Sequence, residues 1–287
     1  TNDERKGIMA AYYTSVEYMD KNVGIVLKGI EEAGIKENTL VFYIWGDNGS
    51  SSEGIHGTVS ELLTQNQIPV TLDDQLKVLE EMGGLDVLGT PATDNHYNAG
   101  WAWSASTPYK GTKLTAAYFG GTRQPLAVSW PAKIKHDTKL RTQFHHVSDI
   151  GPTIFEILDI TPPQVVNGYN QDPIDGISML YTFNDAEAPE QKKTQFFDIM
   201  GSRGIYNDGW FACTFGPRVP WMTVTPGMGT WTPDKDVWEL YNLKEDWSQA
   251  DDLAKKNPKK LQELKDLFLV ESARNYNMPI GGGLWAL

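Results

Sequence analysis

The chain has 287 residues, of which 40% are hydrophobic and 22% are charged, so it is long enough to bury a substantial core and too apolar for wholesale disorder. Its 25 Lys and Arg against 37 Asp and Glu give a net charge of −12, which argues against a general binder of nucleic acid or anionic membranes. The single Cys213 cannot form an internal disulfide, and no apolar run reaches the length of a transmembrane helix.

A helix is predicted at the start of the chain, where apolar residues recur at steps of three and four. Gly34 stands where this helix would end. The chain opens with charged residues and without an initiator Met, so it is expected to be either a piece of a longer protein or a trimmed complete domain. The apolar stripe consists of Tyr12, Val16, Met19, Val23, Val26, Leu27 and Ile30.

The next segment, 39–45, is apolar nearly throughout and rich in β-forming residues. Because it lacks alternation, it predicts a strand buried on both faces, as in a parallel sheet covered by helices. Such sheets bind ligands beyond the carboxyl ends of their strands. The polar residues 46–49 that follow therefore lie where these folds place chemistry.

The middle of the chain is predicted to alternate between loops and short elements, and Thr71 with Asp74 is spaced like a helix capping box. A long loop, 89–112, carries Trp101 and Trp103. The other predicted elements are a loop at 50–57, helices at 58–65, 72–82 and 146–159, and a buried strand at 126–130.

The pattern of residues along the sequence changes near residue 161. Residues 161–194 resemble a connector. Short strand-like pieces, with a turn at Asn207-Asp208-Gly209, then predict a small antiparallel sheet. Pro258 is placed for the first turn of a helix that runs to about residue 274. The predicted strands are 195–200, 203–206, 209–214 and 236–241.

Asp47 and Asn48, bracketed by Gly46 and Gly49, are the strongest chemical feature of the sequence. Carboxylate and carboxamide oxygens suit Ca²⁺ or Mg²⁺ better than Zn²⁺. Two other interpretations stay open from spacing alone. Asp-Asn-Gly is a common turn, and Asn48-Gly49-Ser50 is a glycosylation sequon, which would exclude Asn48 as a metal ligand.

Lys113 lies in a glycine-flanked loop, where it could hold an oxyanion or simply face solvent. His56 and His96 fall in loops near the predicted site, but no spacing assigns them a role. His145 and His146 at a helix start are predicted to be structural, and Cys213 to be a buried apolar residue. Tryptophans 101, 103, 210 and 221 could line a ligand pocket or pack in the core.

Five segments in order resemble a sulfatase, in particular the later part of a large bacterial arylsulfatase of the alkaline-phosphatase superfamily. Together they extend over most of the chain. They are Tyr18-Met19-Asp20 with Val23-Gly24; residues 38–42 leading to 46–49 and Glu53-Gly54; residues 107–113 with 119–125; residues 146–153; and residues 238–243 with Asn257-Pro258.

The resemblance implies an alkaline-phosphatase-like fold, with a three-layer sheet covered by helices on both faces and a small C-terminal antiparallel sheet with a terminal helix. The expected division is 1–160 for the later part of the catalytic core, 161–194 for a connector and 195–287 for the small sheet subdomain. Asp47 and Asn48 would be two ligands of the divalent cation, Ca²⁺ with Mg²⁺ as the alternative. Lys113 would contact the sulfate ester.

The departures from the family pattern are equally specific. No Cys/Ser-x-Pro/Ala-x-Arg motif for formylglycine is present, because Cys213 has Pro and Arg at the wrong spacing and follows the metal turn. Tyr118 stands where relatives often have His. We therefore expect no catalytic nucleophile in this chain, a formylglycine in a missing N-terminal half, and inactivity of the chain alone.

The resemblance predicts hydrolysis of sulfate monoesters, either a small aryl sulfate or a sulfated glycan. The alternatives are a phosphate or phosphonate ester hydrolase of the same superfamily and a non-catalytic calcium- or glycan-binding remnant. The sequence does not fix the localisation; a periplasmic or secreted bacterial protein is favoured over a cytoplasmic one.

Overall fold

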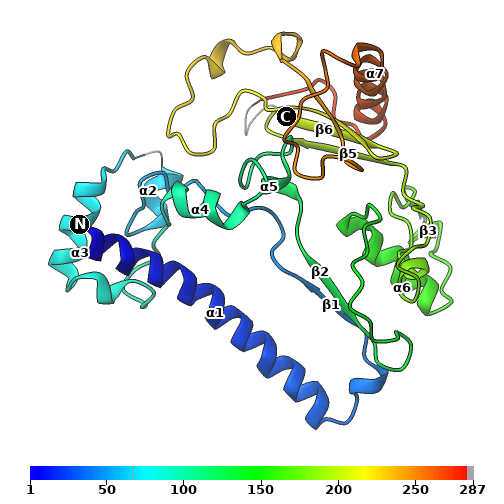
Figure 1. Cartoon of the computed structure of the whole chain (residues 1–287), viewed down its shortest axis with the longest axis horizontal. Coiled ribbons are helices and arrows are strands. Elements are labelled where there is room, and N and C mark those ends of the chain that lie inside the picture. The colour runs from blue at the N-terminus through cyan, green and yellow to red at the C-terminus, as the bar shows by residue number, and fades with distance from the viewer. Residues whose placement is uncertain (67, 283–287) are drawn as a thin grey trace.

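The computed structural model describes residues 1–66 and 68–282. Helices and strands are mixed, and the strands form small antiparallel sheets. In Figure 1 the long helix α1 runs along one side, the pair β1 and β2 crosses the centre, and the C-terminal sheet lies at the top beside α7. None of the described helices has the length and apolarity required to cross a bilayer.

The first helix, α1, spans Asn2–Glu32 and confirms the predicted N-terminal helix. Thr1 forms a capping box with Glu4 at its start, and Gly34, with φ of 70°, follows its end. No residue of α1 is buried. The apolar stripe is thus largely uncovered, with Val26 62% exposed.

The central strands β1 (Val41–Ile44) and β2 (Leu126–Ser129) pair antiparallel with each other. The predicted buried parallel sheet is wrong for the described residues, which form no three-layer arrangement. Every residue of β1 is half-buried and Leu126 is 41% exposed. In this two-stranded ribbon each strand has one neighbour, and both faces of the ribbon are left uncovered. The apolar sequence of β1 is nevertheless typical of a strand covered on both faces.

The short helices between the central strands are α2 (Glu61–Gln65), α3 (Leu72–Met82), α4 (Ala99–Ser106) and α5 (Phe119–Thr122). The Thr71–Asp74 capping box and the end of α3 at Gly83 are confirmed. The prediction of one continuous loop over 89–112 is wrong at α4. There the Asn98 side chain accepts a hydrogen bond from the Gly100 amide and caps a helix that buries Ala102.

A buried charge network lies at the start of α6 (Ile150–Ile157), which follows a 3-10 turn at Val147–Asp149. Asp149 accepts hydrogen bonds from the His145 ring and from the buried Lys192 ammonium, both at 3.0 Å or less. The structural role predicted for His145 is confirmed by this contact. The network joins α6 to the end of the segment 161–194, whose own elements are the small hairpin strands β3 (Val165–Val166) and β4 (Tyr169–Asn170).

The C-terminal sheet has the strand order β5-β6-β7-β8 and is antiparallel throughout, as predicted. Asp208 and Gly209, both at positive φ, turn β6 into β7. The helix α7 (Pro258–Arg274) buries Leu264 and Phe268 against the sheet. The strands are β5 (Thr194–Ile199), β6 (Ser202–Asn207), β7 (Trp210–Thr214) and β8 (Glu239–Asn242).

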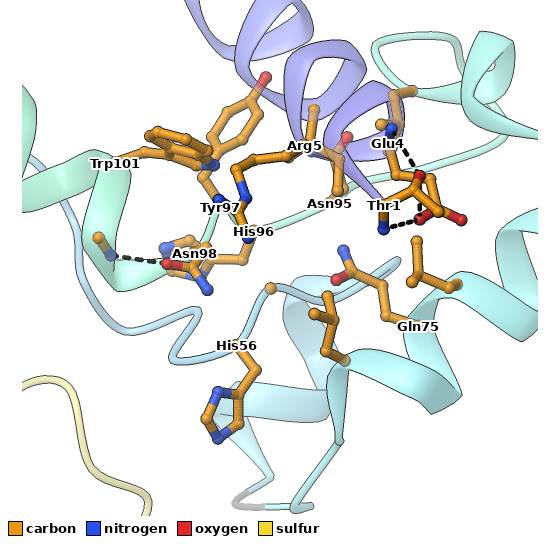
Figure 2. A pocket seen from close by; sticks show the side chains of 16 residues that line it. Thr1, Glu4, Arg5, His56, Gln75, Asn95, His96, Tyr97, Asn98 and Trp101 are labelled. Atoms are coloured by element: carbon orange, nitrogen blue, oxygen red, sulfur yellow. Dashed lines mark hydrogen bonds and ion pairs between the residues drawn. The ribbon is translucent and has the colours of Figure 1, made fainter.

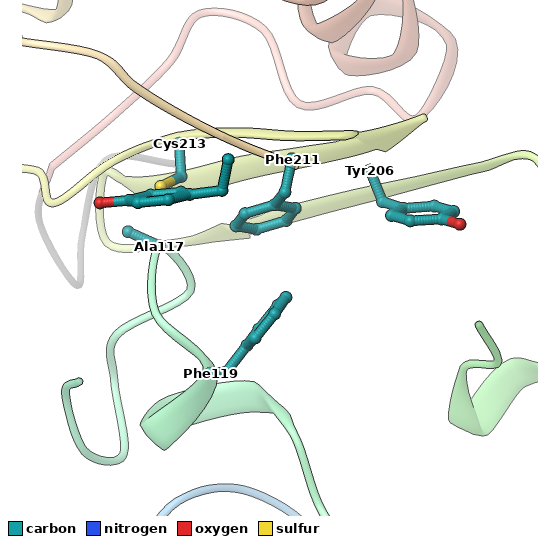
Figure 3. Close-up of a cluster of buried hydrophobic side chains, with 6 residues drawn as sticks. Ala117, Phe119, Tyr206, Phe211 and Cys213 are labelled. Atoms are coloured by element: carbon teal, nitrogen blue, oxygen red, sulfur yellow. The ribbon is translucent and has the colours of Figure 1, made fainter. Parts of the chain in front are cut away.

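The other face of this sheet packs against the segment that carries Lys113. Figure 3 shows Ala117 and Phe119 facing Tyr206, Phe211 and Cys213 in one buried cluster. Cys213 is fully buried, as predicted, and burial raises the pKa of its thiol. The small sheet is therefore the support on which the lysine segment rests.

Two side chains from the C-terminal part fasten the same segment by hydrogen bonds. The fully buried Gln249 donates to the Ala117 carbonyl at 3.0 Å and accepts from the Phe119 amide at 2.8 Å. The Ser202 hydroxyl accepts from the Ala117 amide at 3.1 Å. These bonds satisfy backbone groups that would otherwise be buried without partners.

Candidate active site

The candidate metal turn follows β1 directly. Gly46 adopts φ of 95°, a conformation that favours glycine. A hydrogen bond of 3.0 Å from the Trp45 amide to the Pro125 carbonyl holds the turn to the start of β2. Asp47 is exposed and Asn48 is half-buried, so both side chains are accessible to a ligand.

The turn is packed backbone to backbone against the glycines of α5. The Gly49 amide donates a hydrogen bond of 3.0 Å to the Gly121 carbonyl. A Cβ atom added at Gly49 would lie 1.7 Å from the carbonyl oxygen of Gly120, which no side chain tolerates. Position 49 must therefore be glycine for the two loops to approach this closely.

Lys113 lies beside the same turn. Its amide donates a hydrogen bond of 3.1 Å to the Ser50 carbonyl, and the Ser52 and Thr112 hydroxyls meet at 2.7 Å in a buried contact. The loop 50–53 and the loop 111–113 thus run together, although they are far apart in sequence. The fold brings the backbone of Lys113 to Ser50, which directly follows the 46–49 turn.

The Lys113 ammonium is held by a carboxylate. Its Nζ lies 2.9 Å from Oε2 of Glu53, and the lysine side chain remains 36% exposed. Arg218, from the loop after β7, lies 3.8 Å from the other oxygen, Oε1, of the same carboxylate. Two cations from different parts of the chain therefore share the Glu53 carboxylate. No sequence motif indicated this contact.

A polar chain leads from Glu53 to His96. The Ser51 hydroxyl donates to Oε2 of Glu53 at 3.2 Å, and Nε2 of His96 lies 2.8 Å from the same hydroxyl. The second ring nitrogen of His96, Nδ1, is buried and has no hydrogen-bond partner among the described residues. Burial lowers the pKa of His96, an effect that the nearby Lys113 charge reinforces and the Glu61 and Glu53 carboxylates oppose.

A cavity of about 400 Å³ adjoins this histidine. Figure 2 shows it enclosed by Arg5 of α1, Gln75 of α3 and Trp101 of α4, with His56 and His96 on its walls. Trp101 thus lines a pocket, one of the two roles that its sequence left open. Trp103 instead packs edge to face on Trp221, with ring centroids 5.2 Å apart.

Tyr118 belongs to a separate network under the lysine segment. Its hydroxyl donates to Oε1 of Glu239 at 2.8 Å, while the Lys110 ammonium donates to the Tyr241 hydroxyl at 2.7 Å and lies 4.4 Å from the centre of the Tyr118 ring. Burial, and then the hydrogen bond to Glu239, raise the pKa of Tyr118 far above its ordinary value. Tyr118 therefore stays neutral and serves as a packing and anchoring residue.

The two oxygen donors at Asp47 and Asn48 fit a hard divalent cation only in part. Neither side chain makes a hydrogen bond or ion pair with the described part of the chain, so both are free to coordinate. Calcium takes six to eight oxygen ligands. Within residues 1–66 and 68–282, however, no group of three or more His, Cys, Asp or Glu could hold a metal. The two donors of this turn alone are fewer than calcium takes.

Comparisons with known proteins identify the family. The sulfatase family model matches residues 1–160. The chain belongs to the sulfatase family. An uncharacterized sulfatase of Schizosaccharomyces pombe is 29% identical over 92% of this chain and 43% of its own length. An arylsulfatase of Klebsiella aerogenes is 21% identical over 68% of this chain and 38% of its own length.

Solved structures show the same fold at low identity. A Bacteroides thetaiotaomicron protein, described in connection with the metabolism of multiple glycosaminoglycans, aligns with a TM-score of 0.56 at 19% identity and covers 90% of this chain and 43% of that one. A Pseudoalteromonas sulfatase aligns with a TM-score of 0.53 at 14% identity and covers 91% and 42%. A protein crystallised with a neocarrahexaose aligns with a TM-score of 0.52 at 17% identity and covers 93% and 42%.

The coverage is consistent across these relatives. This sulfatase chain spans about 40% of the length of the relatives it matches. The sequence located the Asp47-Asn48 turn and Lys113, but it gave no role to Glu53, Ser51, His96 or Arg218. Only Glu53 had a signal, because it follows the metal turn closely in the sequence.

Proposed function

We propose that the sulfatase to which this chain belongs hydrolyses sulfate monoesters, and that this chain contributes part of its metal site and its sulfate-binding lysine. The observation that supports the proposal is the contact between the two loops. Gly49 packs on Gly120 and Gly121, and the Lys113 amide bonds to Ser50, so the loop that carries the lysine packs on the loop that carries two hard oxygen donors. Cationic groups placed in this way stabilise charge on a transferring sulfuryl group.

Asp47 and Asn48 are proposed as two ligands of Ca²⁺, with Mg²⁺ as the alternative. A bound dication would withdraw charge from the oxygens of the ester. Lys113, whose side chain is partly exposed, binds a sulfate oxygen through its ammonium. Lysine suits this task because it is a compact point charge with three donors on a flexible stem.

The nucleophile and the other metal ligands are proposed to lie in the part of the sulfatase that this chain does not include. The sequence has no Cys/Ser-x-Pro/Ala-x-Arg motif, and the metal donors in the described residues are too few for calcium. Formylglycine is accordingly expected outside this chain. The uncovered stripe of α1 and the exposed β1–β2 ribbon are proposed to pack on that part, and the chain alone should be inactive.

The proposed division of the chain follows the same reasoning. Residues 1–160 would form the later part of the catalytic core, 161–194 a connector and 195–287 the supporting sheet. The described part of the connector holds only the two-residue strands β3 and β4 and one short 3-10 turn. A segment of this kind is typical of a link between packed units.

The decisive experiment combines this chain with the N-terminal segment of its parent sulfatase, carrying the formylglycine motif, either fused or co-expressed. We expect the combination to hydrolyse 4-nitrophenyl sulfate in the presence of Ca²⁺ and each part alone to be inactive. Asp47→Ala and Lys113→Ala should each reduce turnover at least 100-fold, in the range reported for loss of an electrostatic catalytic group. No turnover under calcium in a correctly folded combination would contradict the proposal.

The same assay separates the sulfatase from the related ester hydrolases. Turnover of 4-nitrophenyl phosphate or phosphonate above that of the sulfate would favour the alternative activity. A second set of assays uses sulfated oligosaccharides as substrates, since one solved relative was crystallised with a neocarrahexaose. Release of inorganic sulfate, measured by ion chromatography, distinguishes an aryl sulfate from a sulfated sugar as the preferred substrate.

A binding function without catalysis is supported by one observation, the cavity beside His96 with Trp101 on its wall. Aromatic and polar side chains around a concave site are typical of small-ligand pockets. Binding of oligosaccharides to the isolated chain, unchanged by Lys113→Ala and lost in Trp101→Ala, would favour this alternative. The sulfatase proposal instead expects binding to depend on Lys113.

A further inference from the structure

Arg218 meets the candidate site from the C-terminal part of the chain. Its guanidinium lies 3.8 Å from Oε1 of Glu53, while Lys113 lies 2.9 Å from Oε2. The three side chains are partly buried, with 28%, 22% and 36% of Arg218, Glu53 and Lys113 exposed. Two cations from distant segments of the sequence converge here on one carboxylate.

The loop that carries Arg218 packs on the turn before β6. Gly216, at φ of 81°, lies so close to the turn before β6 that a Cβ would come within 2.4 Å of the Gly201 carbonyl oxygen. Pro217 follows and restricts the backbone immediately before the arginine. The arginine is thus placed by backbone packing and does not depend on a long flexible connection.

Two aromatic contacts join the same loop to the lysine segment. Phe215 packs on Tyr118 with ring centroids 5.8 Å apart, and Trp221 packs on Trp103 of α4 at 5.2 Å. Phe215 and Trp221 also contact each other at 5.9 Å. Because these contacts lie on both sides of residue 218 in the sequence, they fix its position relative to Lys113.

We propose that Arg218 is a second anion-binding residue, which acts with Lys113 on the sulfate group of the ester, and that Glu53 is the internal anion that holds both cations while no ligand is bound. This inference rests on the proposed function and extends it to a residue outside the family match. Two cations around one carboxylate leave a net positive charge at the site, which attracts a sulfate oxyanion. Arginine is suited to binding a sulfate group, since its planar guanidinium can donate two hydrogen bonds to one anion.

The test is the binding of inorganic sulfate to the full chain, measured by isothermal titration calorimetry at low ionic strength. Arg218→Ala should weaken the sulfate affinity about tenfold, the usual effect of losing one charge-assisted hydrogen bond. Arg218→Lys, which keeps the charge, should retain part of it. The matched control is Arg274→Ala, because Arg274 also lies 3.8 Å from a carboxylate, that of Glu271, but its side chain is 62% exposed at the end of α7.

Glu53→Gln is expected to change the sulfate affinity in the opposite direction to Arg218→Ala. Removing the carboxylate frees both cations, so sulfate should bind several-fold more tightly than to the wild-type chain. A merely structural role for Glu53 would instead weaken binding or leave it unchanged. Urea unfolding of every variant shows whether the chain is folded under the conditions of the titration.

The outcomes are separable from those of the proposed function. Equal sulfate affinity in the wild-type chain and Arg218→Ala, including no detectable binding by either, overturns the role of Arg218. If both bind sulfate equally and Lys113→Ala weakens that binding, the proposed sulfate lysine stands without Arg218. If Arg218→Ala weakens binding and Lys113→Ala does not, Arg218 is an anion site independent of Lys113, and the two-cation proposal fails.

Discussion

The backbone amide of Gly49 donates a hydrogen bond of 3.0 Å to the carbonyl oxygen of Gly121. This single contact joins the turn after β1 to the helix α5 that follows the Lys113 loop. The hydrogen bond needs close backbone approach, and Gly49 leaves room for it because it has no side chain. A Cβ at Gly120 or Gly121 would instead meet carbonyl oxygens of residues 110–115, so these two glycines allow α5 to pack on the lysine loop. The candidate metal donors and the candidate sulfate lysine are therefore positioned by backbone packing.

Gly49→Ala tests this packing. The new methyl group would lie 1.7 Å from the Gly120 carbonyl oxygen, so the two loops must separate. We expect the free energy of unfolding to fall by at least about 2 kcal/mol, as for overpacking of a tight interior. Urea denaturation followed by circular dichroism measures the change.

The matched control is Gly24→Ala in the middle of α1, where an added Cβ meets no atom within 4 Å. This variant should gain about 0.5 to 1 kcal/mol, because alanine favours the helix over glycine. If Gly49→Ala were as stable as Gly24→Ala, the close contact between the two loops would not exist in solution.

Gln249→Leu tests how the C-terminal sheet holds the lysine segment. The substitution removes both hydrogen bonds from the buried amide and leaves the Ala117 carbonyl and the Phe119 amide without partners. Unsatisfied buried groups of this kind cost about 1 to 3 kcal/mol each, so we expect a loss of roughly 2 to 5 kcal/mol in the free energy of unfolding.

The control for this variant is Gln262→Leu on the exposed face of α7, where the glutamine side chain donates to Asp266. Its effect should stay within about 0.5 kcal/mol, as for ordinary surface substitutions. Equal urea midpoints for the two leucine variants would show that Gln249 does not anchor the segment.

The pKa of His96 reports the charges of the candidate site without requiring activity. Burial places it below the ordinary histidine value, and the Glu53 carboxylate raises it while the Lys113 ammonium lowers it. Glu53→Gln should therefore lower the pKa of His96 further, and Lys113→Ala should raise it. Titration of the ring protons by NMR measures both, and shifts of the opposite sign would place His96 elsewhere than in this polar chain.

The acid stability of the chain should depend on Asp149. Burial would raise the pKa of this carboxyl, but hydrogen bonds from His145 and Lys192 outweigh it and lower the pKa to about 2. A carboxyl with a lowered pKa contributes stability above its unfolded value of 3.8 and loses it as the pH falls toward 2. We expect about 2 kcal/mol of unfolding free energy to be lost over this range.

Asp149→Asn removes this pH dependence and leaves the Lys192 ammonium, 3% exposed, without its carboxylate. Loss of one partner of a buried ion pair costs about 3 to 5 kcal/mol at neutral pH. Asp208→Asn, which breaks an exposed pair with Lys193, is the control and should change stability little. A variant at 149 that unfolds with the same pH profile as the wild-type chain would contradict the assignment.

Local signals in the sequence were sufficient for much of the secondary structure. The apolar stripe and the Thr71–Asp74 capping box predicted α1 and α3, and Asn207-Asp208-Gly209 predicted the turn between β6 and β7. Such features depend on neighbouring residues only. The helix α4 was missed because its start depends on one capping side chain, Asn98, within a segment rich in glycine and aromatic residues.

The sequence by itself determined the family, through five segments in order along the chain, and the antiparallel C-terminal sheet, through strand-like pieces separated by turns. It also named Asp47 and Asn48 as candidate oxygen donors and Lys113 as the candidate sulfate residue. Only the tertiary structure decided that β1 pairs antiparallel with β2, that Glu53 joins Lys113 to Arg218, and that His96 reaches the site through Ser51. These contacts join residues far apart in the chain, and their distances follow from how the loops pack.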